Sequence, residues 1–117
     1  MKKFKDLVPG NTLYTLCIDP DSGEALRITS CIVDSINHSG TVVGVRFVNP
    51  DNKSETLVDY FRVNPESYIN DSLKEYKEHR VKALFETIND AVDNYIYYCE
   101  DKIQQYQNNI TKVEKIV

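Results

Sequence analysis

The chain has 117 residues, 41% of them hydrophobic and 27% charged, as is usual for one folded domain or a small domain with an appendage. Its net charge of −4 and pI near 5.1 make nucleic-acid binding an unfavoured function, because dedicated nucleic-acid binders carry a basic surplus. No run approaches the ~18 apolar residues that a membrane-spanning helix needs, so we expect no membrane contact.

The cysteines and histidines give no pattern of a metal or redox site. Cys17, Cys31 and Cys99 are odd in number, far apart and without a Cys-x-x-Cys pair, which predicts reduced thiols and a cytoplasmic location. His38 and His79 are equally isolated, so we expect no metal and no other cofactor. Since no serine, histidine or carboxylate pair has the partners of a catalytic group, the sequence predicts a protein that is not an enzyme.

Short β-rich runs alternate with turn signals in the first half of the chain. Pro20-Asp21-Ser22-Gly23 combines a preset φ, an Asx side chain and a residue that tolerates positive φ, and Asn37-His38-Ser39-Gly40 closes the next hairpin. Turns about ten residues apart favour an antiparallel meander that curls into a small barrel or sandwich. The expected strands are Thr12–Asp19, Glu24–Ile36, Thr41–Val48 and Glu55–Asp59, with Phe61–Val63 as an optional fifth.

The pairing and the faces of this sheet are less determined. Pairing Asp19 with Glu24 places Cys17 opposite Leu26, whereas a bulge at Gly23 places Leu16 there. The second strand carries apolar residues on both faces, which fits either a bent barrel strand or a face covered by the helix or a neighbouring subunit. The core residues expected from the later strands are Val45, Phe47, Leu57, Tyr60 and Phe61.

The second half of the chain is predicted to be helical. Asn64-Pro65-Glu66 has the form of a helix start and predicts a helical turn at 65–69, and Asn70-Asp71-Ser72 predicts the cap of a long helix from about 71. The expected division is therefore 1–63 as a small antiparallel β-barrel and 64–117 as a helical region. Three poor helix formers cluster in Thr87-Ile88-Asn89-Asp90, so a kink or a helical hairpin near Asn89 remains an alternative.

One apolar stripe runs along this predicted helix. Its members recur every three or four residues, as expected for one helix face: Val81, Leu84, Ile88, Val92, Tyr95, Cys99, Ile103, Tyr106, Ile110, Val113 and Val117. Spacings of eleven residues give way to spacings of seven, which does not fit a standard two-stranded zipper. We expect Leu73 to Ile88 to complete the barrel core and the part from Val92 onward to be covered by another chain. The predicted interface residues are Val92, Tyr95, Ile96, Tyr98, Ile103, Tyr106 and Ile110.

Four residues near the N-terminus carry a resemblance to a known group of proteins. Phe4, Leu7, Gly10 and Tyr14 form a Phe-x-x-Leu-x-x-Gly-x-x-x-Tyr pattern that precedes the predicted hairpins and helix. This arrangement resembles small proteins encoded by tailed bacteriophages, in which a short SH3-like β-barrel precedes a C-terminal helix. The resemblance implies an α+β fold with an SH3-like antiparallel barrel of four or five strands, and it carries over no catalytic residue.

Two functions are consistent with these predictions. The first is a non-enzymatic structural or adaptor protein, phage-encoded, whose long helix mediates a homo-oligomer or a larger assembly in the host cytoplasm or the virion. The alternative is a binding module that sequesters a small ligand or inhibits a host defence protein. That alternative requires Arg27, Arg46 or Arg62 to line a concave pocket.

Overall fold

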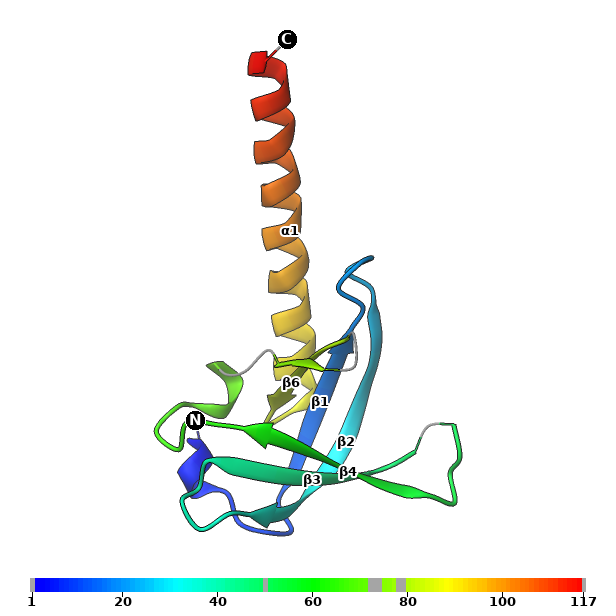
Figure 1. Cartoon of the computed structure of the whole chain (residues 1–117), viewed down its shortest axis with the longest axis vertical. Coiled ribbons are helices and arrows are strands. Elements are labelled where there is room, and N and C mark those ends of the chain that lie inside the picture. The colour runs from blue at the N-terminus through cyan, green and yellow to red at the C-terminus, as the bar shows by residue number, and fades with distance from the viewer. Residues whose placement is uncertain (1, 50, 72–74, 78–79, 117) are drawn as a thin grey trace.

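An antiparallel sheet and one long C-terminal helix make up the computed structural model, which describes residues 2–49, 51–71, 75–77 and 80–116 (Figure 1). The sheet has the strand order β4-β3-β2-β1-β6-β5. The α+β class and the order of sheet and helix are therefore confirmed. The elements of the described residues are η1 (Phe4–Asp6), β1 (Thr12–Ile18), β2 (Ala25–Ile36), β3 (Val42–Val48), β4 (Thr56–Arg62), η2 (Ile69–Asp71), β5 (Glu75–Lys77), β6 (Arg80–Phe85) and α1 (Ile88–Ile116).

The first four strands lie close to their predicted positions, with two corrections. Asp19 donates its N–H to the carbonyl of Glu24 at 2.9 Å, as in the first predicted register. The register then shifts, so that Cys17 lies opposite Arg27 and neither expected partner of Leu26 is correct. Phe61 is the second correction, because it continues β4 to Arg62 and does not begin a separate strand.

The sheet is curled, and its inner face holds the larger core. Phe61 on β4 and Leu84 on β6 belong to the same buried cluster although three strands separate them in the sheet order. Lys82 on β6 donates to Asp59 on β4 at 3.2 Å across the same interior. Both side chains are largely shielded from water, so this ion pair joins the two sides of the curl.

The core predictions are partly correct. Val45 and Phe61 are fully buried, Phe47 packs against the same cluster and Leu57 is half-buried. Tyr60 is 55% exposed, because it alternates with Asp59 and Phe61 and lies on the outer face of β4. In β2, the residues that are buried in the core are Cys31 and Val33.

The helix covers the second apolar face over β1 and β6 and at Ala25, the first residue of β2. Leu16 and Ile18 of β1 and Ala83 and Phe85 of β6 form a second buried cluster with Ala91 of α1. β1 is thus enclosed on both faces. The outer face of β2 beside it remains partly exposed.

The predicted helix from residue 71 is wrong in its first part. Residues 75–77 and 80–85 are strands, and Val81 and Leu84 of the expected stripe lie on opposite faces of β6. The expected helical turn at 65–69 is also displaced, since the helical turn in this region is η2, Ile69–Asp71. Leu73, the expected start of the stripe's core part, lies outside the described residues.

α1 begins at the segment that was expected to weaken it. Thr87 accepts a hydrogen bond from the backbone N–H of Asp90 at 3.1 Å, and its own hydroxyl donates to the Asp90 carboxylate at 2.7 Å. This is the arrangement of an N-cap, which satisfies donors that the first helical turn leaves unpaired. The helix then continues without a break to Ile116, so the kink near Asn89 is not present.

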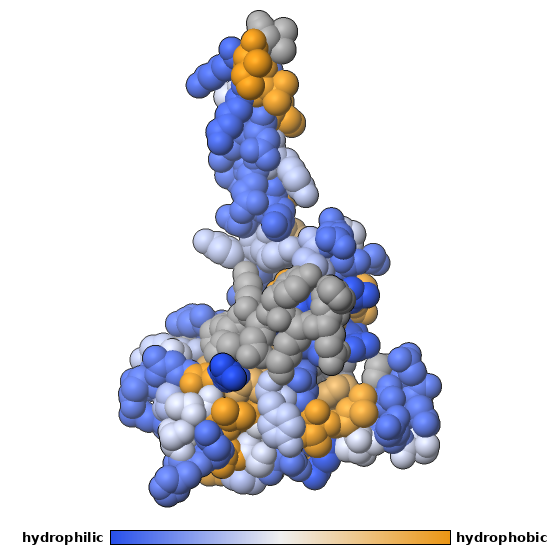
Figure 2. Space-filling model, in the orientation of Figure 1, coloured by the Kyte–Doolittle hydropathy of each residue, from blue (hydrophilic) through white to orange (hydrophobic). Residues whose placement is uncertain are grey.

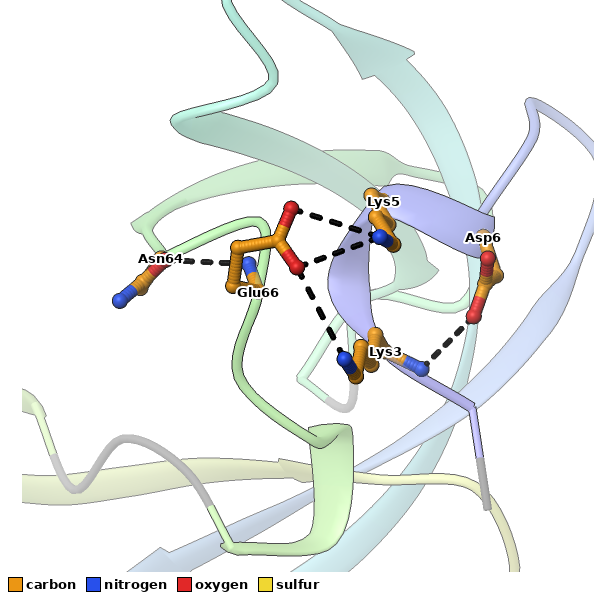
Figure 3. A network of polar contacts seen from close by, with 5 residues as sticks. All are labelled: Lys3, Lys5, Asp6, Asn64 and Glu66. Atoms are coloured by element: carbon orange, nitrogen blue, oxygen red, sulfur yellow. Dashed lines mark hydrogen bonds and ion pairs between the residues drawn. The ribbon is translucent and has the colours of Figure 1, made fainter.

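A polar network fastens the N-terminal turn to the loop after β4 (Figure 3). Lys5 Nζ lies 3.2 Å from Glu66 Oε2, and Lys3 Nζ lies 3.7 Å from the same oxygen. Asn64 accepts a hydrogen bond from the Glu66 N–H, which shapes the loop. Because these groups are exposed, the ion pairs contribute little to stability. Burial of Phe4 and Leu7 in the inner core contributes more.

Candidate interaction surface

The base of α1 is fixed to the sheet by an alanine and two tyrosines. Ala91 is fully buried, and the Tyr95 and Tyr98 rings stack with their centroids 6.3 Å apart. The Tyr95 hydroxyl donates to the carbonyl of Gly23 at 2.9 Å and accepts from the N–H of Ala25 at 3.2 Å. Gly23 takes φ +72°, which a turn of this shape requires. The β1–β2 hairpin therefore sets the position of the helix.

An open groove of about 430 Å³ lies between this hairpin and α1. Pro20 and Glu24 contribute from the hairpin, and Lys102, Ile103 and Tyr106 contribute from the helix. The Lys102 ammonium lies 5.6 Å from the centre of the Tyr98 ring, a cation–π contact. The groove is mainly apolar, with one charge of each sign at its rim.

From the groove onward, α1 extends past the strands (Figure 1). Every residue of this distal segment, 103–116, is exposed. Its apolar side chains include Ile103, Tyr106, Ile110 and Val113, which are between 56% and 63% exposed. Figure 2 shows apolar side chains gathered near the C-terminal end of the helix. A second apolar recess, lined by Tyr106, Ile110 and Val113, continues along the same side.

The seven residues predicted for an interface fall into two groups. Tyr95 and Tyr98 are half-buried against the hairpin, and five residues keep large exposed surfaces: Val92, Ile96, Ile103, Tyr106 and Ile110. Val113 and Ile88 are exposed to a similar degree but were not among the predicted residues. Both belong to the stripe, so the spacing of three and four residues could have identified them as members of the predicted interface.

The outer face of the sheet holds another apolar surface. Ile28 and Ile32 of β2, Val48 of β3 and Val58 and Tyr60 of β4 are each more than a third exposed. Leu26 extends this surface toward the β1–β2 hairpin. The ion pair between Arg46 and Asp34, 3.0 Å long, lies at its centre, because Arg46 is opposite both Ile32 and Val58 in the register.

Any one of the three arginines would meet the predicted condition for a ligand pocket, and two of them line recesses at separate places: Arg27 at the mouth of the curled sheet and Arg46 beside Ile32 and Val48. Arg27 lines the polar mouth of the curled sheet together with Asp59 and Lys82, whose ion pair occupies that position. Arg46 and Arg62 alternate with the buried Val45 and Phe61 and therefore lie on the outer face.

The thiols differ in their surroundings. Burial raises the pKa of Cys31 to about 12, although its contact with the Leu13 carbonyl opposes the shift. Cys17 is also buried, whereas Cys99 is partly exposed on α1. A hydrogen bond with the Cys99 thiol raises the pKa of the Tyr95 phenol above its ordinary value, and desolvation adds to the effect.

The described residues show neither a cluster of three His, Cys, Asp or Glu side chains suited to a metal ion nor a helix able to span a membrane. Comparison of the chain with protein families, with curated proteins and with solved structures gives no match.

Proposed function

We propose that this chain is a non-enzymatic adaptor or structural protein that assembles with another protein chain through α1. The single observation that carries the proposal is the apolar face of the distal segment, which extends beyond the sheet with no part of the described chain covering it. Large exposed apolar patches on folded proteins mark interaction sites.

The size of this face supports an interface. Covering the exposed parts of Val92, Ile96, Ile103, Tyr106, Ile110 and Val113 removes on the order of 600 Å² of surface from water per chain, close to the ~800 Å² per partner of a standard interface. Tyr106 belongs to this apolar face, and tyrosine is one of the residue types that often dominate the binding energy of an interface.

The N-terminal pattern supports a particular biological setting. Phe4 and Leu7 are buried in the inner core, and Gly10, at φ +97°, donates its N–H to Val33 at 2.8 Å where the chain turns into β1. These roles suit the first residues of an SH3-like barrel, as in the phage proteins that the pattern resembles. We therefore propose virion or host-cytoplasmic assembly of a phage as the context of the interaction.

Light scattering coupled to size-exclusion chromatography tests the role of α1. The intact chain at micromolar concentration is expected to give a mass above the 13.5 kDa of one chain. Replacing Ile103 and Ile110 by Gln removes two members of the apolar face while keeping good helix formers, and it is expected to restore the monomer.

Tyr97→Gln is the matched control, because Tyr97 is 71% exposed on the opposite side of the same helix. This variant is expected to keep the mass of the unaltered chain. Equal masses for the Ile103/Ile110 variant and the unaltered assembly would contradict the proposed role of the apolar face.

A further inference from the structure

The exposed apolar residues of α1 follow a stricter repeat than the sequence stripe suggested. Val81 and Leu84 are not part of this helix face, because they belong to β6. Tyr95 is not part of it either, because its hydroxyl is bonded to the hairpin. Ile88 lies four residues before Val92, a second step of four, and is therefore outside the repeat. With Ile96 in place of Tyr95, the seven residues from Val92 onward are separated by alternating steps of four and three: Val92, Ile96, Cys99, Ile103, Tyr106, Ile110 and Val113. This is a period of 3.5 residues, which predicts a left-handed supercoil.

We propose that α1 pairs with α1 of a second copy of this chain as a parallel, in-register, two-stranded coiled coil. The a positions are Ile96, Ile103 and Ile110, and the d positions are Val92, Cys99, Tyr106 and Val113. This inference rests on the proposed function and names its partner, its stoichiometry and its direction.

The residue types at the seam favour two strands. β-branched residues at a combined with Leu at d favour parallel dimers; all three a positions here are Ile, although no d position is Leu. The two central d positions, Cys99 and Tyr106, are not β-branched, so the seam lacks the β-branched pattern at both a and d that favours three strands. The valines at the two outer d positions are the exceptions.

The charges beside the seam favour the parallel direction. The e positions are Asp93, Glu100, Gln107 and Glu114, and the g positions are Tyr95, Lys102, Asn109 and Ile116. In a parallel coil each e row faces the partner's g row, which contains a single charge, the positive one of Lys102. An antiparallel coil places the two acidic e rows against each other, and like charges at such positions repel.

The sheet leaves Val92 and Ile96 exposed at the base of the helix, and the β1–β2 hairpin flanks the seam at Cys99 across the open groove. Ala91 marks the side that faces the sheet, and Ile96 lies about 140° away from it around the helix axis at 100° per residue. Val92 and Ile96 are 39% and 50% exposed at the level where the sheet still flanks α1. A two-fold axis parallel to α1 then places the two sheets on opposite sides of the coil.

Cys99 allows the direction to be tested with the native thiol. In the parallel coil it faces Cys99 of the partner, and a short bis-maleimide is expected to convert most chains to a covalent dimer. In the antiparallel register that pairs Ile96 with Val113, Cys99 faces Ile110 of the partner, and the two Cys99 residues are displaced by about 16 Å along the axis at 1.5 Å per residue. Cys17 and Cys31 are buried, so Cys99→Ser is expected to abolish crosslinking.

A second reporter separates the remaining arrangements. In the chain that carries Ile110→Cys beside Cys99, a parallel coil gives 99–99 and 110–110 crosslinks, and an antiparallel coil gives 99–110 crosslinks, as peptide mass spectrometry can read. Light scattering on the uncrosslinked chain must give twice the mass of one chain.

The outcomes distinguish this inference from the proposed function. A mass of three or four chains, or an assembly joined only through 99–110 crosslinks, overturns the parallel dimer while leaving assembly through α1 in place. Assembly that persists in the Ile103/Ile110 variant overturns both. A single-chain mass at all concentrations, with no crosslink, overturns the coiled coil and limits any assembly to a different protein.

Discussion

Replacing Tyr95 by Phe tests how α1 is held on the sheet. The substitution keeps the ring, and therefore its packing beside Tyr98, but removes the hydroxyl that joins the helix to the β1–β2 hairpin. Both hydrogen bonds to the hairpin are lost, the one donated to the Gly23 carbonyl and the one accepted from the Ala25 N–H, together with the contact between the hydroxyl and the Cys99 thiol.

The expected loss follows from the burial of these groups. A neutral hydrogen bond contributes roughly 0.5–1.5 kcal/mol, and a shielded group left without a partner adds a desolvation cost. Because the Tyr95 contacts are only partly buried, water reaches some of the exposed positions and limits that cost. We expect the free energy of unfolding to fall by about 2 kcal/mol.

Urea denaturation followed by circular dichroism measures this change. The Ile103/Ile110 variant is the appropriate background, since association would add to the apparent stability. Tyr97→Phe is the control, because this ring is 71% exposed, and it is expected to change the unfolding free energy by less than about 0.5 kcal/mol. If Tyr95→Phe is as stable as its background, the hydroxyl does not anchor the helix and the reasoning is refuted.

Three further changes test other parts of the fold. Thr87→Ala removes the N-cap of α1 and should lower the unfolding free energy by about 1 kcal/mol, with Thr87→Ser retaining most of it; equal loss in both variants would exclude a capping role. Lys82→Met leaves the carboxylate of Asp59 without this ion-pair partner inside the curl, so the free energy of unfolding measured in urea should fall by about 2 kcal/mol. The double variant Asp59→Asn/Lys82→Met should recover part of this loss, and no recovery would argue against charge pairing as its cause. The raised pKa of Cys31 means that the folded state keeps the thiol neutral, so the stability that the thiol contributes is complete below pH 9 and is lost as the pH rises toward about 12. Cys31→Ala should therefore flatten the alkaline decline of the unfolding free energy in urea titrations, and an unchanged dependence on pH would contradict this reasoning.

The first four strands could be predicted because their boundaries are local. Gly23 and Gly40 adopt positive φ in turns whose residue types already indicate them. The register at Leu26 could not be predicted in the same way, because a bulge there depends on how β2 meets both β1 and the helix above it.

The missed strands show the limit of periodicity. In Arg80–Phe85 both faces are buried, one in the inner core through Leu84 and the other beneath α1 through Ala83 and Phe85. A strand with two apolar faces lacks the alternation that distinguishes it from a helix. Thr87 and Asp90 supplied the missing signal, since a threonine followed three residues later by an acid is typical of a helix start.

The stripe lies on α1 from Ile88 onward, whereas its first two members, Val81 and Leu84, lie on β6. The eleven-residue step from Val81 to Val92 therefore joins a strand to a helix and does not describe one helix face. The orientation of the arginines was not available from sequence, because the inward face of each strand depends on the bulges that precede it. Their distribution over two faces is therefore visible only in the folded chain.

Because α1 is attached to the sheet at its N-terminal end, helix formation is expected to proceed from that end toward Ile116. A segment as short as residues 103–116 is a marginal helix in water, because starting the first turn is costly whereas extending an existing turn is not. The Thr87 cap and the Tyr95 anchor supply that first turn, so the sheet acts as the nucleus of the helix. We therefore expect fraying to begin at Ile116, and we expect opening of the β1–β2 hairpin to remove the Tyr95 anchor and leave the Thr87 cap as the remaining support of the first turn.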